Sequence, residues 1–146
     1  MKNLFKLAIV IICCMTCSCN DRCDWLELAL FEYVSFINES NHFVNVFIDE
    51  ISNSCKIDGF TLSPGEKYES PLNSCGLLID RAIVTFDNDV EIVHELNQDP
   101  IPEGFRNICK NDPSWWEFEE EGKCGEIAHY TFRFTDSDYE FAASQQ

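Results

Sequence analysis

The feature that most constrains the fold is a series of short blocks in which apolar and polar residues alternate. Val44, Val46 and Ile48 share one face of an extended chain by their period of two, and residues 127–134 repeat the pattern. Turn formers separate such blocks, as in residues 63–66, where Pro and Gly suit a tight turn. This patterning predicts β-strands rather than helices.

The spacing of the blocks predicts an all-β protein, an antiparallel β-sandwich with an immunoglobulin-like layout and a short C-terminal helix. The helix is expected to begin at Thr135, with Asp138 three residues on completing a capping box. We expect residues 97–113 to form a long irregular connection and residues 119–123 an acidic turn. The expected strands are 33–38, 43–49, 59–62, 67–69, 77–86, 90–94, 115–118 and 127–134.

The amino-terminal segment has the composition of an export signal. Lys2 and Lys6 precede an apolar run over residues 7–14, which is shorter than the ~20 apolar residues that span a bilayer. The sequence Met-Thr-Cys-Ser-Cys that ends at Cys19 resembles a bacterial lipobox, in which a small residue precedes an acylated cysteine. Cys17 is a weaker acceptor, and an ordinary secretory signal cut nearby is the alternative.

The lipobox resemblance implies three regions. Residues 1–18 are expected to be the signal peptide, residues 19–31 the lipidated Cys19 with its tether, and residues 32–146 the β-sandwich domain. Several acyl chains such as palmitate on one cysteine would make a stable anchor. Acidic residues directly after Cys19 resemble the surface-export tether of lipoproteins in Bacteroides-like bacteria.

Taken whole, the chain resembles small, uncharacterised lipobox-containing β-sandwich lipoproteins of Bacteroides-like bacteria. The resemblance rests on the lipobox, the hairpin series and the closing segment YTFRFTDSDY at residues 130–139. It implies an all-β domain in the cell envelope, lipid-anchored to the outer membrane and either surface-exposed or periplasmic. It carries no catalytic residues with it.

The charge balance excludes one class of partner. The chain has 26 acidic and 10 basic residues and a formal net charge of −16, whereas a phosphate backbone needs a basic face. We therefore expect no nucleic acid. The expected partners are the membrane, reached through the N-terminal lipid, and a glycan or an envelope protein.

The cysteines are consistent with an oxidising compartment. Beyond the signal and Cys19, the chain holds Cys23, Cys55, Cys75, Cys109 and Cys124. The preferred pairing is Cys55 with Cys75 and Cys109 with Cys124, although the spacing does not fix the connectivity. No Cys-x-x-Cys pair or zinc-ligand spacing occurs in the mature chain, so we expect no metal and no cofactor.

The most distinctive candidate site is the cluster Trp115, Trp116 and Phe118. On a strand, Trp116 and Phe118 face one way and Trp115 the other. An exposed Trp beside carboxylates can hold a sugar face or anchor a hydrophobic partner. The alternative is that both tryptophans pack, one in the core and one under the long connection.

Other chemistry-bearing residues favour structural roles. Residues 87–89 with Glu91 supply calcium-type oxygens but lack an EF-hand spacing, so a hairpin turn is expected. His42, His94 and His129 are scattered, and no hydrolase motif occurs. We therefore expect a non-enzymatic binding or accessory module. The alternatives are a structural subunit of an outer-membrane complex and, less favoured, a small envelope hydrolase.

Overall fold

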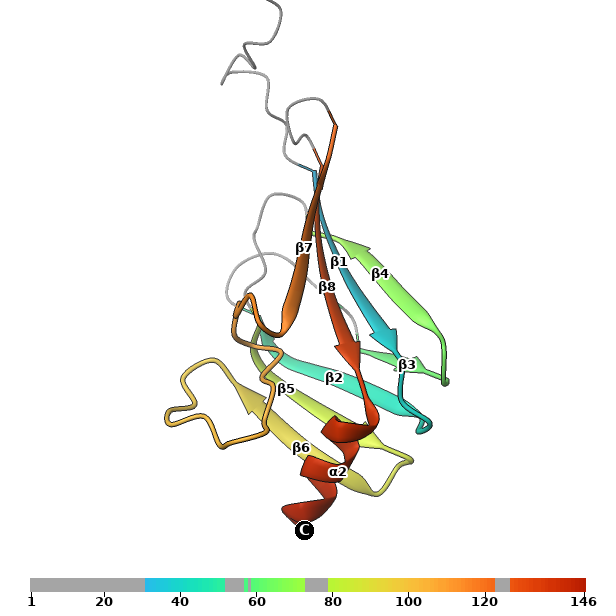
Figure 1. The fold of residues 1–146 in the computed structure, drawn as a ribbon, viewed down its shortest axis with the longest axis vertical. Helices are drawn as coiled ribbons and strands as arrows, with labels where there is room; N and C mark the ends of the chain where they lie inside the picture. Colours follow the sequence, from blue (N-terminus) through green and yellow to red (C-terminus); the bar gives the residue numbers. More distant parts are fainter. Residues whose placement is uncertain (1–30, 52–56, 58, 73–78, 123–126) are drawn as a thin grey trace, which may run out of the picture.

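Two four-stranded β-sheets pack face to face in the computed structural model, and one short helix follows the last strand (Figure 1). The structure describes residues 31–51, 57, 59–72, 79–122 and 127–146. The predicted β-sandwich with a C-terminal helix is therefore confirmed. The elements are β1 (Phe31–Asn38), β2 (Val44–Ile51), β3 (Phe60–Leu62), β4 (Lys67–Pro71), β5 (Ile79–Phe86), β6 (Val90–Glu95), β7 (Trp116–Glu121), β8 (Ile127–Phe134) and α2 (Asp136–Ser144).

The strand order is β4-β1-β8-β7 in one sheet and β3-β2-β5-β6 in the other. The pairing of β1 with β8 is parallel, from Phe31 opposite Ile127 to Asn38 opposite Phe134. The expectation of wholly antiparallel sheets is wrong at this pair. Strands that are far apart in the sequence can pair in either direction. Turn residues in the sequence indicate only the antiparallel pairing of consecutive strands, so they do not predict the direction of this pair. In the described ranges, no helix has the length and apolar character needed to cross a bilayer.

Alternating side chains from both sheets form the core. Phe36, Phe86, Phe132 and Phe134 are fully buried. Their rings meet edge-on or stacked, with Phe132 and Phe134 centroids 5.1 Å apart. Burying a side chain of this size stabilises the fold by about 1.5–3 kcal/mol, so these aromatics supply much of the cohesion between the sheets.

A polar network closes one end of the sandwich. Asn38 is fully buried, and its Nδ2 donates to the carbonyl oxygens of His42 and Leu62. His42 Nδ1 lies 2.5 Å from Asp87 Oδ2, and the backbone N–H of Phe43 donates to Asp87 Oδ1. These bonds hold the β1–β2 turn against the β5–β6 turn.

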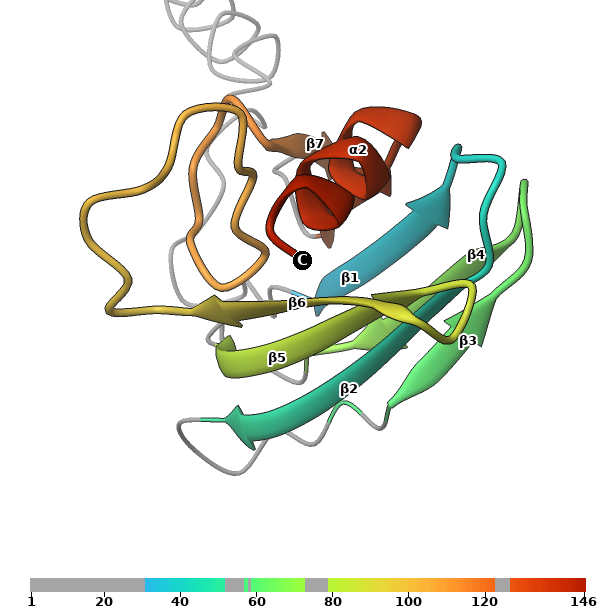
Figure 2. The same ribbon diagram turned by 90° about the horizontal axis from the view of Figure 1, so that it is seen from below.

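The helix and the long connection cover one side of the sandwich, where β6 ends its sheet (Figure 2). The connection between β6 and β7 contains no strand or helix, as predicted for residues 97–113. Arg106 from this connection donates to both carboxylate oxygens of Asp138 and to the carbonyl oxygen of Arg133. The Thr135 N–H donates to Asp138 Oδ2, which completes the predicted capping box.

Cys109 differs from the disulfide expectation. It is a buried free thiol whose Sγ donates to the His94 carbonyl oxygen at 3.3 Å, so it does not form the predicted bond with Cys124. Burial raises the pKa of the Cys109 thiol to about 12, which keeps it protonated and unreactive. Cys19, Cys23, Cys55, Cys75 and Cys124 lie outside the described residues.

Candidate binding surface

The structure separates the three aromatic residues of the predicted cluster. Trp116 is 3% exposed and lies in the core, with its ring 5.2 Å from that of Phe132. Trp115 is partly buried and packs against the same core. The hypothesis of a tryptophan platform is therefore wrong for Trp116, and the alternative that both tryptophans pack is confirmed.

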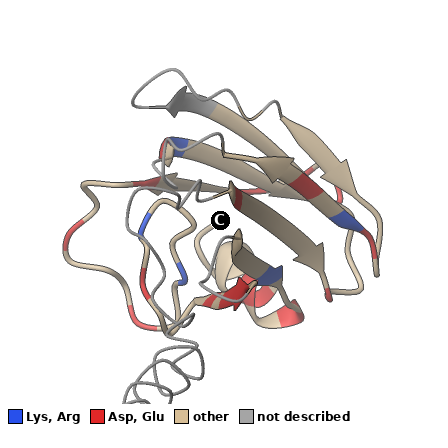
Figure 3. Ribbon diagram, turned by 90° about the horizontal axis from the view of Figure 1, so that it is seen from above, with Lys and Arg blue, Asp and Glu red and all other residues tan. Residues whose placement is uncertain are grey.

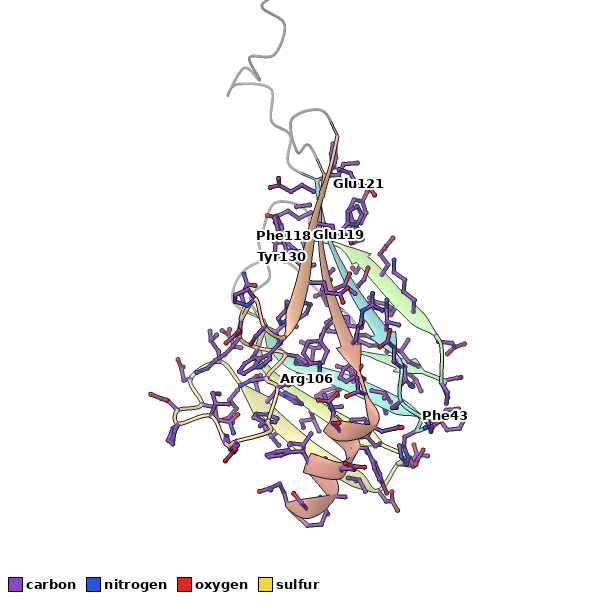
Figure 4. All side chains as sticks on the ribbon, viewed as in Figure 1. Phe43, Arg106, Phe118, Glu119, Glu121 and Tyr130 are labelled. Carbon is purple, nitrogen blue, oxygen red and sulfur yellow. The ribbon has the colours of Figure 1, made fainter. Side chains whose placement is uncertain are left out.

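Phe118 has the opposite environment. It is 52% exposed, and its ring centroid lies 5.2 Å from that of Tyr130 on β8 (Figure 4). The register pairs Phe118 with Tyr130 and Trp116 with Phe132, so all four side chains lie on one face of the sheet. Of the three predicted residues, Phe118 is the one that is presented to solvent.

The length of β7 explains the difference between Trp116 and Phe118. The strand continues to Glu121, and every residue after Trp116 is exposed. β7 and β8 extend beyond the described strands of the other sheet, so no described strand of that sheet faces their far ends (Figure 1). The predicted acidic turn at residues 119–123 is wrong at Glu119–Glu121, because pairing with β8 keeps these glutamates in the strand.

We call the exposed part of β7 together with Tyr130 of β8 the aromatic–acidic strip. Phe118, Glu120 and Tyr130 lie on the inner face of the sheet, and Glu119 and Glu121 lie on its outer face. Figure 4 shows its labelled members along the projecting part of β7 and β8. Burial raises the pKa of the Tyr130 hydroxyl, and the negative charges of Glu32 and Glu120 raise it further. Tyr130 therefore remains a neutral hydrogen-bond donor beside carboxylates.

The outer face of the same sheet holds a second set of acids. Arg133 donates to both oxygens of Glu117 at 2.9 Å and to Glu39 at 2.6 Å. Its hydrogen bonds lower the pKa of the Glu117 carboxyl and raise that of Arg133. Glu117 is thereby committed to an internal contact.

The acids farther along β7 are less engaged. Glu121 lies 3.9 Å from His129 Nε2, which is beyond hydrogen-bond distance. His129 stacks on Tyr33 with ring centroids 5.4 Å apart. Glu119 and Glu120 form no ion pair with any residue that the structure describes. Acidic segments are distributed over both sheets, the helix and the long connection in the described part of the chain (Figure 3).

β7 is an edge strand within the part of the chain that the structure describes. It pairs with β8 on one side, and no described strand lies on the other. The opposite sheet ends at β6, where Asn107 Nδ2 donates to the Glu95 carbonyl oxygen and Gln146 Nε2 to that of Glu91. Described side chains therefore cover part of the β6 edge, whereas no described strand pairs with the outer edge of β7.

A small cavity lies between the sheets under α2 and the long connection. Its lining includes His94, Arg106 and Asp138 among aromatic side chains. The Ile108 N–H donates to His94 Nδ1, so the proton of the neutral ring sits on Nε2, which has no partner among the described residues. The cavity has a volume of about 10 Å³, which is enough for one water molecule and too small for a larger ligand.

Desolvation sets the protonation state of His94. Its burial lowers the pKa to about 3, so the ring is neutral throughout the physiological range. His42 lies in a turn, and His94 and His129 lie on strands, as predicted. The three do not form a common site.

The predicted hairpin turn at residues 87–89 is confirmed. Asp87 and Asn88 both have positive φ, at 51° and 71°, as in a type I′ turn, and Phe86 pairs with Val90 across the connection. The hydrogen bond from His42 lowers the pKa of Asp87. Across the described residues, no three His, Cys, Asp or Glu side chains are grouped as metal ligands.

Comparison of the chain with family models, curated proteins and solved structures gave no match in any of the three. The alternation of strand residues predicted that Phe118 and Trp116 share a face, but no sequence signal marked where the facing sheet ends. Tyr130 was expected in a strand and not at a site.

Proposed function

We propose that this chain is a non-catalytic binding or accessory protein of the cell envelope, anchored to the outer membrane through Cys19. In this proposal the aromatic–acidic strip is its contact surface. The observation that carries the proposal is Phe118, an aromatic side chain more than half exposed yet held against Tyr130 on a paired strand.

The rigid position of the Phe118 ring on β7 favours a role in binding a partner. β7 is fixed at its start by buried Trp116 and along its length by β8, so the ring is positioned before any partner arrives. A preorganised aromatic group loses little conformational entropy on binding, and aromatic residues are enriched at the centres of protein interfaces. An exposed phenylalanine on a rigid strand is therefore a suitable anchor.

The charge of the strip favours a cationic protein as its partner. Glu119 and Glu120 carry no compensating ion pair among the described residues, and the chain as a whole is strongly acidic. Such a field repels anionic polymers and steers basic groups towards the surface. A neutral glycan stacking on Phe118 is the competing outcome.

The position of the strip is compatible with a membrane anchor. Phe31 and Glu121 are both paired with Ile127, so the start of β1 and the end of β7 lie at the same end of the molecule. The dozen or so residues between Cys19 and Phe31 can span at most about 40 Å. A lipid on Cys19 would therefore keep the strip near the membrane surface.

Cell fractionation tests the anchor. With Cys19→Ser we expect the chain to move from the membrane to the soluble fraction and to lose labelling by a palmitate analogue. Cys23→Ser is the matched control and should remain membrane-bound and labelled. Loss of both properties in Cys17→Ser, with Cys19→Ser unchanged, would move the anchor to Cys17. Membrane retention of every variant would overturn the proposed attachment.

Site-specific photo-crosslinking tests the contact surface. A photoreactive phenylalanine analogue is placed at position 118 or at position 43, where Phe43 is 54% exposed at the opposite end. In intact cells we expect a discrete cross-linked protein from position 118 and none from position 43. The same product from both positions, or none from position 118, would contradict the proposal.

A further inference from the structure

The edge of β7 combines three properties that an added strand can use. The edge has no described partner strand. Its outer-face positions carry Glu119 and Glu121, and its inner-face positions carry Phe118 and Glu120. A chain paired along this edge would meet carboxylates on one face and an aromatic ring on the other.

Edge protection alone does not account for this composition. Charged residues on an edge strand prevent edge-to-edge aggregation, and the glutamates of β7 serve that purpose. Phe118 works against it, because an exposed aromatic side chain in the middle of an edge strand favours association. A surface that repels its own copy yet keeps an apolar anchor is suited to a partner of opposite charge.

We propose that β7 accepts an extended, cationic segment of a partner protein as a further strand of its sheet. Lys or Arg side chains of that segment lie beside Glu119 and Glu121, and an apolar side chain lies beside Phe118. This inference rests on the proposed function and specifies the chemistry of its partner. Main-chain hydrogen bonds supply binding, and the alternating side chains supply selectivity.

A second copy of this chain is the disfavoured occupant. Pairing two β7 edges would place Glu119, Glu120 and Glu121 of each copy beside those of the other. Like charges opposite each other on neighbouring strands destabilise the pair. A basic strand removes this repulsion and gains an attraction instead.

Peptide binding to the full-length chain in detergent tests the inference. The probe is a short labelled peptide in which lysine alternates with threonine and phenylalanine replaces the central threonine. Its controls are a scrambled peptide of the same composition and two N-methylated forms. One form is methylated at the backbone nitrogens of the lysines, and the other at the backbone nitrogens of the remaining residues. Because the N–H groups of alternate residues point to opposite edges of a strand, each form blocks one edge of the peptide.

Strand addition predicts a distinct pattern of affinities. We expect the scrambled peptide to bind at least about tenfold more weakly and one N-methylated form to lose binding while the other retains it. Glu119→Lys should weaken binding by about tenfold or more, and Phe118→Ser should weaken it as well. Glu103→Lys is the matched control, because Glu103 is an exposed acid in the long connection, and it should have little effect. Circular dichroism establishes that each variant is folded.

Two results would overturn strand addition. Equal binding of the scrambled peptide and both N-methylated forms would mean diffuse charge attraction, and no binding by any peptide would mean that the edge does not accept such a strand. Either result leaves the proposed function standing if the photoreactive group at position 118 still yields its discrete product. Failure of that cross-link would overturn the proposed function itself.

Discussion

At the closed end of the sandwich, Asp87 and Asp136 each hold a neighbouring segment in place, whereas Glu119 and Glu120 on β7 hold nothing that the structure describes. Asp87 binds His42 and the Phe43 N–H, and Asp136 accepts two hydrogen bonds from Asn41. Acidic side chains thus serve the fold at one end and remain available at the other. The acids of this chain therefore divide into those that hold the fold together and those that have no ion pair among the described residues.

The largest expected effect is a loss of stability on removal of the Trp116 side chain, and Phe118 on the same face of β7 is its comparison. Trp116→Ala should lower the free energy of unfolding by about 3–5 kcal/mol, because it removes a large buried side chain and leaves a cavity. Phe118→Ala should lower it by less than about 1 kcal/mol, because that ring is half in solvent already. Chemical denaturation measures both. Equal losses would mean that Phe118 is a core residue and that the strip is structural.

The next effect concerns the acid that ties α2 to the long connection. Asp138 accepts hydrogen bonds from Arg106 and from the Thr135 N–H, and its side chain is 13% exposed. Asp138→Ala should therefore cost roughly 2–3 kcal/mol, because charged hydrogen bonds are lost and a partly buried guanidinium is left unpaired. Glu140→Ala on the exposed side of the same helix should change stability by less than about 0.5 kcal/mol. A similar loss in both variants would contradict the assignment of the helix dock to Asp138.

A pH-dependent effect distinguishes His94 from the acids at the closed end. The folded state keeps His94 neutral down to about pH 3, whereas the unfolded chain protonates it below the ordinary histidine pKa of 6.5. The unfolded state therefore binds more protons between these values, and stability should fall by up to about 1.4 kcal/mol per pH unit as the pH is lowered. Denaturation at a series of pH values measures this slope.

The matched variants are His94→Asn and Asp87→Asn. Asparagine at position 94 keeps an acceptor for the Ile108 N–H but does not titrate, so the slope between pH 6.5 and 4 should diminish. The pKa of Asp87 is lowered in the folded state, so its contribution is present above its unfolded pKa of 3.8 and is lost only below that value. An unchanged slope in His94→Asn would show that His94 is not the group responsible.

The smallest expected effect is on β7. Glu119→Gln should change stability by no more than about 0.5 kcal/mol and should stabilise slightly at low salt, because it relieves repulsion between neighbouring glutamates. This gain should disappear at high salt, where exposed charges are screened. Thermal unfolding at two ionic strengths measures it. A clear loss of stability would mean that Glu119 has a structural partner.

The sequence predicted the local features of the fold well. Alternation located β5 and β8, turn chemistry located the hairpin at Asp87, and the capping residues located the start of α2 at Thr135. These features depend on residues close together in the chain. Local physical rules are sufficient for them.

Features set by distant segments were not predictable in this way. The parallel pairing of β1 with β8 joins strands from opposite ends of the described chain. Consecutive glutamates resemble a turn, yet Glu119 and Glu120 stay extended because β8 supplies their pairing. Trp116 and Phe118 share a face of β7 but differ in exposure, and no property of the two residues records which of them lies over the core.

The most direct test of the account is amide hydrogen exchange of β7 in native membranes compared with the purified full-length chain. The account predicts that amides of residues 117–121 exchange more slowly in membranes, because a partner strand covers the edge, while the turn at residues 39–43 exchanges equally in both. Equal exchange of β7 in the two samples, with slower exchange in membranes at residues 39–43, would contradict it and move the contact surface to the closed end.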